Sequence, residues 1–316
     1  MTSMRKSWMW HASKRFAADP ARRTIAKIFC RGRIPVAWMD IPNWGDALNP
    51  VLVKLLSGRP AQRIKGMYAD RYMVIGSVLG GANARAEVWG SGFIKDGDSL
   101  LEPPRAVHAV RGPLSRDLLI KQGIACPEIY GDPALLLPRF FNPGVIKKHE
   151  VGIVPHFSDK GHPWVESHRN DPRVVILDIE GGIGSFVRSV KSCEMILSSS
   201  LHGLICADAY GIPNAWIKLS DILIGGSFKF RDYRLSIGAK EPAPIDISAK
   251  PPLENVIAGV EFHKLRIDLR KLLLACPFLD DNLREEASTS TPRSCGLPEF
   301  FSKRMSDPTA KYDRLF

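Results

Sequence analysis

Residues 194–219, EMILSSSLHGLICADAYGIPNAWIKL, decide the fold of this chain. The apolar run 194–197 predicts a strand, and 202–210 predicts a helix that ends at Gly211. A second strand is predicted over 215–219. A helix that joins two strands in so short a stretch forms a βαβ unit, whose strands run parallel. The chain is therefore predicted to contain a parallel sheet covered by helices.

The same alternation of apolar runs and helical patterns continues on both sides of this unit. Further strands are predicted over 34–39, 72–79, 87–90, 106–110, 128–130, 151–155 and 174–179. Further helices are predicted over 46–56, 113–122 and 184–192, with one long helix within 253–275. The segment 138–149, PRFFNPGVIKKH, has two prolines, one glycine and no periodicity, which is typical of a linker.

The fold class that follows is α/β, with two doubly wound, Rossmann-like domains facing a cleft. We expect an N-terminal domain over 34–137, a C-terminal domain over 150–280 and a polar tail over 281–316. Ligands of such sheets bind outside the carboxyl ends of the strands. The loops that follow strands are therefore where a functional site is expected.

Composition narrows the class of protein. Of the 316 residues, 45% are hydrophobic and 24% are charged, which is ordinary for a globular protein and excludes a wholly disordered chain or a collagen. No run reaches the roughly 18–20 apolar residues of a spanning helix. The six cysteines form no CxxC pair, so we expect neither a disulfide framework nor a zinc site, and a cytoplasmic location.

The net charge of +11 is concentrated at the N-terminus. Residues 1–33 hold nine basic side chains and one acidic one, interleaved with tryptophan, phenylalanine and isoleucine. This composition fits a solvated basic helix packed on the body, or an amphipathic segment that docks on an anionic membrane surface. No helix-turn-helix, zinc-finger or RNP pattern follows, so we expect no nucleic-acid partner.

Two loops of the C-terminal half carry candidate residues. Ser200 and His202 follow the predicted strand 194–197, at the start of a helix whose N-terminus favours a neutral imidazole and attracts anions. His202 is then a candidate general acid or base, or a histidine that merely caps the helix. His156 follows the strand 151–155 and is a further substrate-binding candidate. Lys229, within the basic run 229–234, belongs either to a solvated face or to an anion clamp.

Loops of the N-terminal half carry the others. Asn43 and Asp46 surround Gly45 before the helix 46–56, where Asp46 can cap the helix, or both side chains can bind ligand hydroxyls. Arg111 precedes a helix N-terminus, an arrangement suited to phosphate or carboxylate. Asp132 follows the strand 128–130. No histidine pair or acidic cluster has metal-ligand spacing, so no metal site is expected.

Four short sequence motifs, in this order, resemble those of the polysaccharide pyruvyl transferase family. They are Asn43-Trp44-Gly45-Asp46, Val110-Arg111-Gly112-Pro113-Leu114-Ser115, Gly131-Asp132-Pro133-Ala134 and Ser200-Leu201-His202-Gly203-Leu204. The likeness runs from about residue 36 to 238. Many relatives carry a glycine-rich version of the first motif, which leaves the role of Asn43 open.

The resemblance implies a GT-B-like two-domain fold and phosphoenolpyruvate as the donor substrate, with no other cofactor. By position, Arg111, His202 and Lys229 match the family's arginine, histidine and lysine around phosphoenolpyruvate, although Arg231 lies close to the lysine match. The acceptor is expected to be a sugar with two suitably placed hydroxyls on a lipid carrier. Residues 1–33 would then hold the enzyme at the cytoplasmic face of the membrane.

Two other classes of function share these features. A GT-B glycosyltransferase that uses a nucleotide sugar would have the same architecture, since function depends on the site rather than the fold. A sugar-binding or scaffold protein without activity is the second alternative. The donor that the protein binds distinguishes the three classes.

Overall fold

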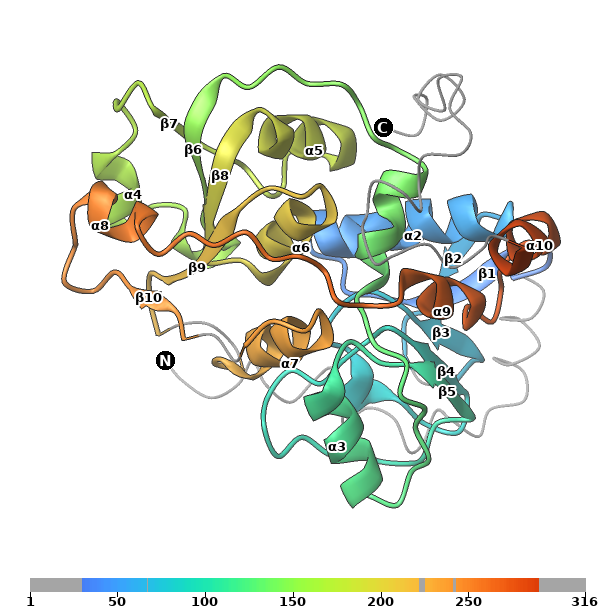
Figure 1. The fold of residues 1–316 in the computed structure, drawn as a ribbon. Helices are drawn as coiled ribbons and strands as arrows, with labels where there is room; N and C mark the ends of the chain where they lie inside the picture. Colours follow the sequence, from blue (N-terminus) through green and yellow to red (C-terminus); the bar gives the residue numbers. More distant parts are fainter. Residues whose placement is uncertain (1–29, 67, 222–224, 241–242, 290–316) are drawn as a thin grey trace.

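Both halves of the chain form a parallel five-stranded sheet with the same strand order (Figure 1). This computed structural model describes residues 30–66, 68–221, 225–240 and 243–289. The first sheet, in the order β2-β1-β3-β4-β5, consists of β1 (Ile34–Ala37), β2 (Ala61–Arg63), β3 (Arg71–Met73), β4 (Ala86–Trp89) and β5 (Ala106–Ala109). The second, in the order β10-β9-β8-β6-β7, consists of β6 (His149–Val154), β7 (Val174–Ile176), β8 (Cys193–Ser198), β9 (Asn214–Lys218) and β10 (Ile245–Asp246).

Counted from its own first strand, each sheet has the order 2-1-3-4-5 of a doubly wound fold. All strand pairs are parallel. The order reverses between β1 and β3 in the first sheet and between β6 and β8 in the second. A doubly wound sheet binds its ligand at this reversal, outside the carboxyl ends of the strands. The predicted Rossmann-like α/β class is confirmed.

Helices cover both faces of each sheet. They are α2 (Trp44–Ser57), α3 (Pro113–Lys121), α4 (Pro163–Ser167), α5 (Ile183–Lys191), α6 (Leu201–Ala209), α7 (Phe228–Ser236), α8 (Leu253–Ile257), α9 (Leu269–Leu274) and α10 (Asp281–Thr289). Short 3₁₀ turns lie at η1 (Leu79–Gly81), η2 (Pro133–Arg139) and η3 (Phe157–Asp159). None of the helices in the described part of the chain is long and apolar enough to cross a membrane.

One hydrophobic cluster extends across both sheets. It includes residues of α2 and η2 from the first half and of α5 and α6 from the second. Trp44 marks the junction: its ring centroid lies 5.9 Å from that of Phe186, and its backbone N–H donates to the carbonyl of Ile179 over 2.9 Å. The two halves are therefore joined through a common core rather than by a linker alone.

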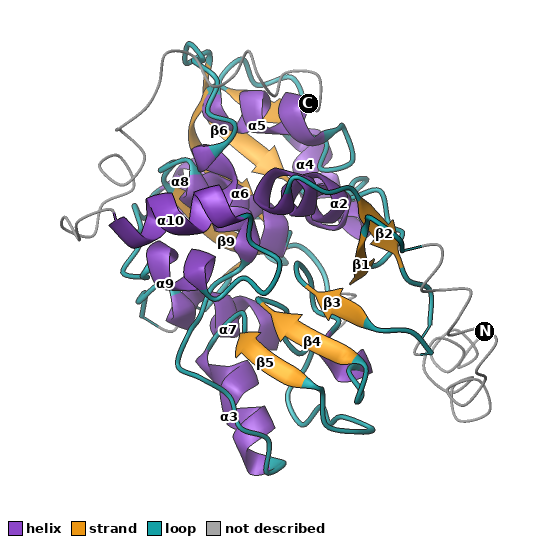
Figure 2. Cartoon of the chain, turned by 90° about the vertical axis from the view of Figure 1, so that its right-hand side faces the viewer, coloured by secondary structure: helices purple, strands orange, loops and turns teal. Residues whose placement is uncertain are grey.

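The C-terminal segment returns to the first sheet. Trp89 Nε1 donates to the carbonyl of Leu272 over 2.9 Å, and the rings of Tyr72 and Phe278 meet at 5.0 Å. Figure 2 shows β3, β4 and β5 side by side, with α9 close to them. The domain boundaries predicted at 34–137 and 150–280 stay a prediction.

The predicted helix over 253–275 is wrong. Its apolar residues have helical spacing, but they belong to two cores: Leu253 and Val256 pack on the second sheet, whereas Leu269 and Leu272 pack in the shared cluster. The chain between α8 and α9 must cross from one core to the other, and Asp268 caps α9 as a new helix by accepting from the backbone N–H of Lys271. We call residues 259–266, within this crossing, the strap.

Other boundaries also differ. The strand predicted over 72–79 ends at Met73, because the side chain of Asn49 takes the backbone N–H and carbonyl of Ile75 in place of a strand neighbour. The strand predicted over 128–130 is a single bridge between Val110 and Tyr130. The basic run 229–234 lies in helix α7, and the predicted tail begins with helix α10. Residues 1–29 of the basic segment lie outside the described residues.

Candidate active site

His202 lies against Gly45 where the two halves meet. Gly45 is in the first turn of α2, which follows β1, and His202 is in the first turn of α6, which follows β8. A Cβ at Gly45 would lie 2.2–2.3 Å from three atoms of the imidazole, nearly equal distances that place it over the face of the ring. The carboxyl ends of the two sheets therefore face each other, and only a glycine leaves room for the imidazole.

The imidazole of His202 is held neutral. Its pKa is lowered to about 3, mainly by burial and then by the positive charges of Lys229 and Arg111, followed by His156. Its Nε2 atom is buried and has no hydrogen-bond partner among the described residues. A neutral ring with a spare nitrogen can accept or relay a proton.

Lys229 supplies a cation beside this histidine. It lies in the first turn of α7, half-buried, with Nζ 5.5 Å from the ring centroid of Phe230. Burial and Arg111 lower its pKa to about 8, and Asp46 opposes that shift. Nζ has no ion pair within the described ranges. Lys229, but not Arg231, is among the charges that shift the pKa values of His202, His156 and Asp46.

Asn43 and Asp46 form the start of α2. The prediction that Asp46 caps this helix is wrong: Asn43 is the cap, and its side-chain oxygen accepts from the backbone N–H of Asp46 over 3.1 Å. The Asn43 amide also donates to the Asp46 carboxylate. Burial raises the pKa of Asp46 to about 6, although Asn43 and, more weakly, Lys229 oppose the shift. Asp46 is thus a buried acid near the lysine.

Arg111 is committed to a protein carboxylate. Its Nε donates to Asp232 of α7 over 3.0 Å, its Nη2 donates to the carbonyl of Phe93 and its Nη1 to the hydroxyl of Ser77. Asp232 also accepts from the backbone N–H and hydroxyl of Ser115 at the start of α3. The anion at this helix N-terminus is therefore Asp232. Direct contact of Arg111 with a substrate stays a prediction. Such a contact would have to be made through Nη1, because Nε and Nη2 are taken by Asp232 and by the carbonyl of Phe93.

The remaining predicted residues surround the same point. Asp132 caps η2 by accepting from the backbone N–H of Ala134 over 2.9 Å, and burial raises its pKa to about 6. Ser200 is the N-cap residue of α6, and its hydroxyl forms no capping hydrogen bond. His156 follows β6 and bonds the Ser158 hydroxyl; burial and then Lys229 lower its pKa to about 4.

Sequence reasoning missed the acids that organise these loops. Asp159 is buried after β6 and accepts from the hydroxyls of Ser199 and Ser220. The Ser199 hydroxyl in turn accepts from the backbone N–H of His156 over 2.8 Å. The only sequence signal for Asp159 was its position after a strand, three residues beyond His156. Asp232 was hidden inside a basic run.

The site thus combines a neutral histidine, a lysine cation and the N-terminus of helix α6. Such a set can bind a small dianion and move a proton next to it. Within the described residues, no group of three His, Cys, Asp or Glu side chains is placed to hold a metal ion.

Comparison with known proteins identifies the class. Residues 56–221 match the polysaccharide pyruvyl transferase family, and the chain belongs to this family. It is 29% identical over 233 residues to the succinoglycan biosynthesis protein ExoV of Rhizobium meliloti (strain 1021), covering 70% of this chain and 69% of that protein. The matched range includes Arg111, Asp132, His156 and His202, whereas Lys229 lies beyond it.

Two other proteins are similar. The uncharacterized protein L143 of Acanthamoeba polyphaga mimivirus is 28% identical over 175 residues, which cover 52% of this chain and 60% of the viral protein. This chain therefore matches less than two thirds of that relative's length. The crystal structure of the functionally uncharacterized protein KP1_0663 from Klebsiella pneumoniae superposes with a TM-score of 0.39 at 12% identity, covering 71% of this chain and 96% of that one.

Proposed function

We propose that this protein transfers the pyruvyl group of phosphoenolpyruvate to two hydroxyls of a sugar in an exopolysaccharide repeat unit. The product is a cyclic pyruvate ketal, and phosphate is released. Family membership and the similarity to ExoV support a role in exopolysaccharide pyruvylation. The observation that carries the donor assignment is the neutral, unpartnered His202 beside the cation of Lys229.

The donor carries a phosphate and a carboxylate, and three groups are available to meet them. Lys229 supplies a full charge, the N-terminus of α6 at Ser200 supplies backbone N–H groups, and Nη1 of Arg111 supplies a further donor. The two facing, doubly wound sheets support a GT-B-like arrangement in which donor and acceptor enter from opposite halves.

The reaction begins with protonation of the methylene carbon. The C–H bond formed there turns CH₂ into CH₃ and leaves an oxocarbenium-like centre at C2. One sugar hydroxyl adds to C2 and loses its proton; the C2–O bond to phosphate breaks, and the second hydroxyl closes the ring. One of the two hydroxyl protons returns to the group that protonated the methylene carbon. The other leaves with the phosphate, which is released as hydrogen phosphate. No cofactor or metal enters this balance.

His202 is the proton-transfer group in this scheme. Lys229 and Arg111 depress its pKa while the donor is absent, and the negative charges of phosphoenolpyruvate would offset them. Donor binding would thus raise the affinity of His202 for a proton at the moment when one is needed. General acid–base groups of this kind typically contribute about 10²–10⁴-fold in rate.

The acceptor is proposed to be a lipid-linked oligosaccharide at the cytoplasmic membrane face. The basic, aromatic composition of residues 1–33 supports attachment to an anionic surface. Cosedimentation with phosphatidylglycerol vesicles tests this point. Deletion of residues 1–33 is expected to abolish vesicle binding at low salt, and unchanged binding would contradict the attachment.

Thermal unfolding with phosphoenolpyruvate, compared with a panel of nucleotide sugars, tests the donor. A ligand at 100 times its Kd raises stability by about 2.7 kcal/mol. Phosphoenolpyruvate is expected to raise the Tm of the wild type and of Lys121→Gln, an exposed cation on α3, but not of Lys229→Gln. A shift with a nucleotide sugar alone would instead favour a glycosyltransferase.

A further inference from the structure

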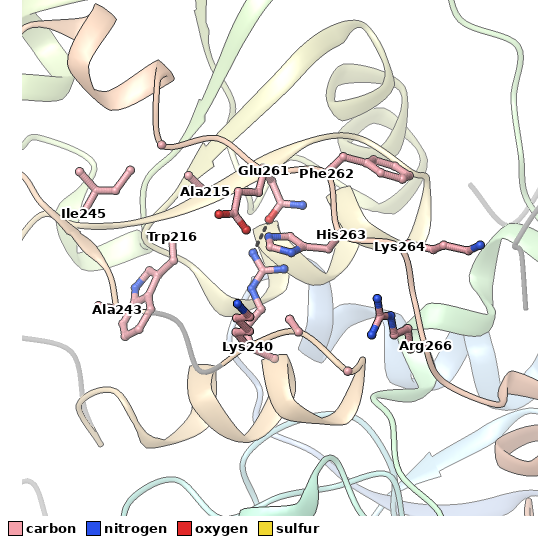
Figure 3. Close-up of a pocket in the computed structure, with 15 residues that line it drawn as sticks. Ala215, Trp216, Lys240, Ala243, Ile245, Glu261, Phe262, His263, Lys264 and Arg266 are labelled. Carbon is pink, nitrogen blue, oxygen red and sulfur yellow. Dashed lines mark hydrogen bonds between the residues drawn. The ribbon is translucent and has the colours of Figure 1, made fainter.

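A basic pocket lies at the far end of α7 from Lys229. It has a volume of about 590 Å³ and lies between β9, the end of α7 and the strap (Figure 3). Neither His202 nor Lys229 is among its lining residues, so the pocket is distinct from the site at His202, although Trp216 in its wall stacks on Phe230, the neighbour of Lys229. A volume of several hundred Å³ is typical of sites for small organic ligands.

Two buried donors that line this pocket are unsatisfied. Arg234 donates through Nη1 to Asp208 and through Nη2 to Asn214, but its Nε has no partner among the described residues. Trp216, stacked on Phe230 at 4.3 Å, likewise leaves Nε1 without one. A buried donor without an acceptor costs about 1–3 kcal/mol. Two of the six unpartnered buried polar atoms of the described residues thus belong to lining residues of one pocket, which favours a ligand that supplies acceptors.

The pocket is also positively charged, which suits a ligand whose acceptors are anionic. Lys240, Lys264 and Arg266 line it and form no ion pair within the described ranges, while Glu261 is the one acid among its lining residues. The aliphatic stem of Arg266 lies on Gly238, where an added Cβ would come within 2.7 Å of the Arg266 Cβ, and the residue is exposed. Its backbone N–H donates to the carbonyl of Ile237 over 2.9 Å.

The end of α7 does not cancel this charge. A helix C-terminus repels anions through its free carbonyls. Here the carbonyl of Arg234 accepts from the backbone N–H of Ala239, and that of Leu235 accepts from Gly238. Carbonyls that are already bonded contribute less to an anion placed beside them, and the lysines and arginine dominate.

An aromatic ring stands at the same pocket. Phe262, one of the lining residues, is 63% exposed and is among the most exposed large apolar side chains of the described part of the chain. Figure 3 shows it on the strap, next to Glu261 and His263. Cations beside an exposed ring and a carboxylate suit a ligand that has both a phosphate and a hydroxylated ring.

We propose that this pocket binds a phosphate ester attached to a ring, of the sugar-phosphate class. Lys240, Lys264 and Arg266 hold the phosphate, Trp216 and Arg234 donate to its acceptors, and Phe262 packs on the ring. The phosphate ester comes either from a soluble sugar phosphate or from a lipid headgroup at the membrane.

Calorimetric titration of the full-length protein with glucose 1-phosphate tests the site. The Lys240→Gln/Lys264→Gln variant is expected to bind it at least tenfold more weakly than the wild type. The Lys65→Gln/Lys121→Gln variant removes the same charge from exposed positions of the first half and is expected to bind like the wild type. Phe262→Ala is expected to weaken binding of glucose 1-phosphate but not of inorganic phosphate.

A parallel arm uses phosphatidylinositol vesicles, whose headgroup is a phosphate ester attached to a hydroxylated ring. Weaker vesicle binding by the pocket variant than by its charge-matched control assigns the phosphate to a lipid headgroup, and a defect with glucose 1-phosphate alone assigns it to a soluble ester. Equal binding by both variants in both arms, or no binding to the wild type, overturns the proposal. The thermal shift with phosphoenolpyruvate is expected to survive in the pocket variant, so this test and that of the donor fail independently.

Discussion

Arg111 and Asp232, which come from different halves of the chain, form an ion pair with Nη2 2.9 Å from Oδ2 and side chains only 1% and 0% exposed. Asp232 lies on α7, three residues after Lys229. The pair therefore holds the first turn of α7 against the first half, beside α3 (Figure 1). Through this contact Arg111 fixes where Lys229 stands relative to His202.

Breaking this pair is expected to be costly. Asp232→Ala leaves a buried guanidinium without its anion, and such losses cost about 3–5 kcal/mol. Urea unfolding measures the change. The exposed pair of Arg169 and Glu166 is the control, since Glu166→Gln is expected to cost less than about 1 kcal/mol. An equal loss of unfolding free energy in the two variants would show that the buried pair does not hold the two halves together.

Gly45→Ala is expected to reduce activity without unfolding the protein. Alanine suits a helix better than glycine does, by about 0.5–1 kcal/mol, but its Cβ would occupy the space of the His202 ring. Displacement of the proton-transfer group should lower turnover by about 10²-fold or more. Gly144→Ala, at a position with open space around it, is the control. Full activity of Gly45→Ala, measured as phosphate release, would show that the reaction does not depend on the packing of His202 against Gly45.

Donor binding is expected to weaken above pH 8. Lys229 has a pKa lowered to about 8 by burial and by Arg111, so its cation is present below that pH and lost above it. The affinity for phosphoenolpyruvate should fall by up to about tenfold per pH unit beyond pH 8. In Lys229→Gln the affinity should be weak and independent of pH in this range. A wild-type affinity that stays constant to pH 9.5 would contradict the role of Lys229.

Asp132→Asn is expected to stabilise the protein at neutral pH. Burial raises the pKa of Asp132 to about 6, so its contribution to stability is full below pH 4 and is lost as the pH rises through 6. Asparagine keeps the acceptor for the backbone N–H of Ala134 but has no charge to bury. The gain over the wild type should be about 2–3 kcal/mol at pH 7.5 and vanish near pH 4. The exposed Asp96→Asn should show no such pH-dependent gain.

The fold was predictable to the extent that its signals are local. Apolar runs predicted most strands of the described chain, and helical patterns, with the stop at Gly211, predicted helices α2, α3, α5 and α6. Helix α7 was missed because its charged residues alternate with its apolar ones and give the stretch the look of a solvated basic run, although Phe228, Phe230 and Tyr233 are buried. The α8–α9 region was misjudged because spacing does not reveal which core a leucine joins.

The site shows the same division. Position after a strand was enough to select His202, His156 and Asp46, which do converge. The position of a residue after a strand could not reveal contacts with residues that are distant in the chain. Arg111 pairs with Asp232, and Gly45 leaves room for His202, only because of how the two halves pack together. No local pattern in the sequence shows this packing.

The core shared by both sheets has a mechanical consequence. Many enzymes built from two doubly wound lobes open and shut about a hinge, but here opening would separate Trp44 from Phe186 and expose the cluster between α2, η2, α5 and α6. The apolar area lost makes such a motion expensive. The groups around His202 should therefore be in their working positions before substrates bind, and the two halves should not close on them. Small-angle scattering should give the same radius of gyration with and without phosphoenolpyruvate.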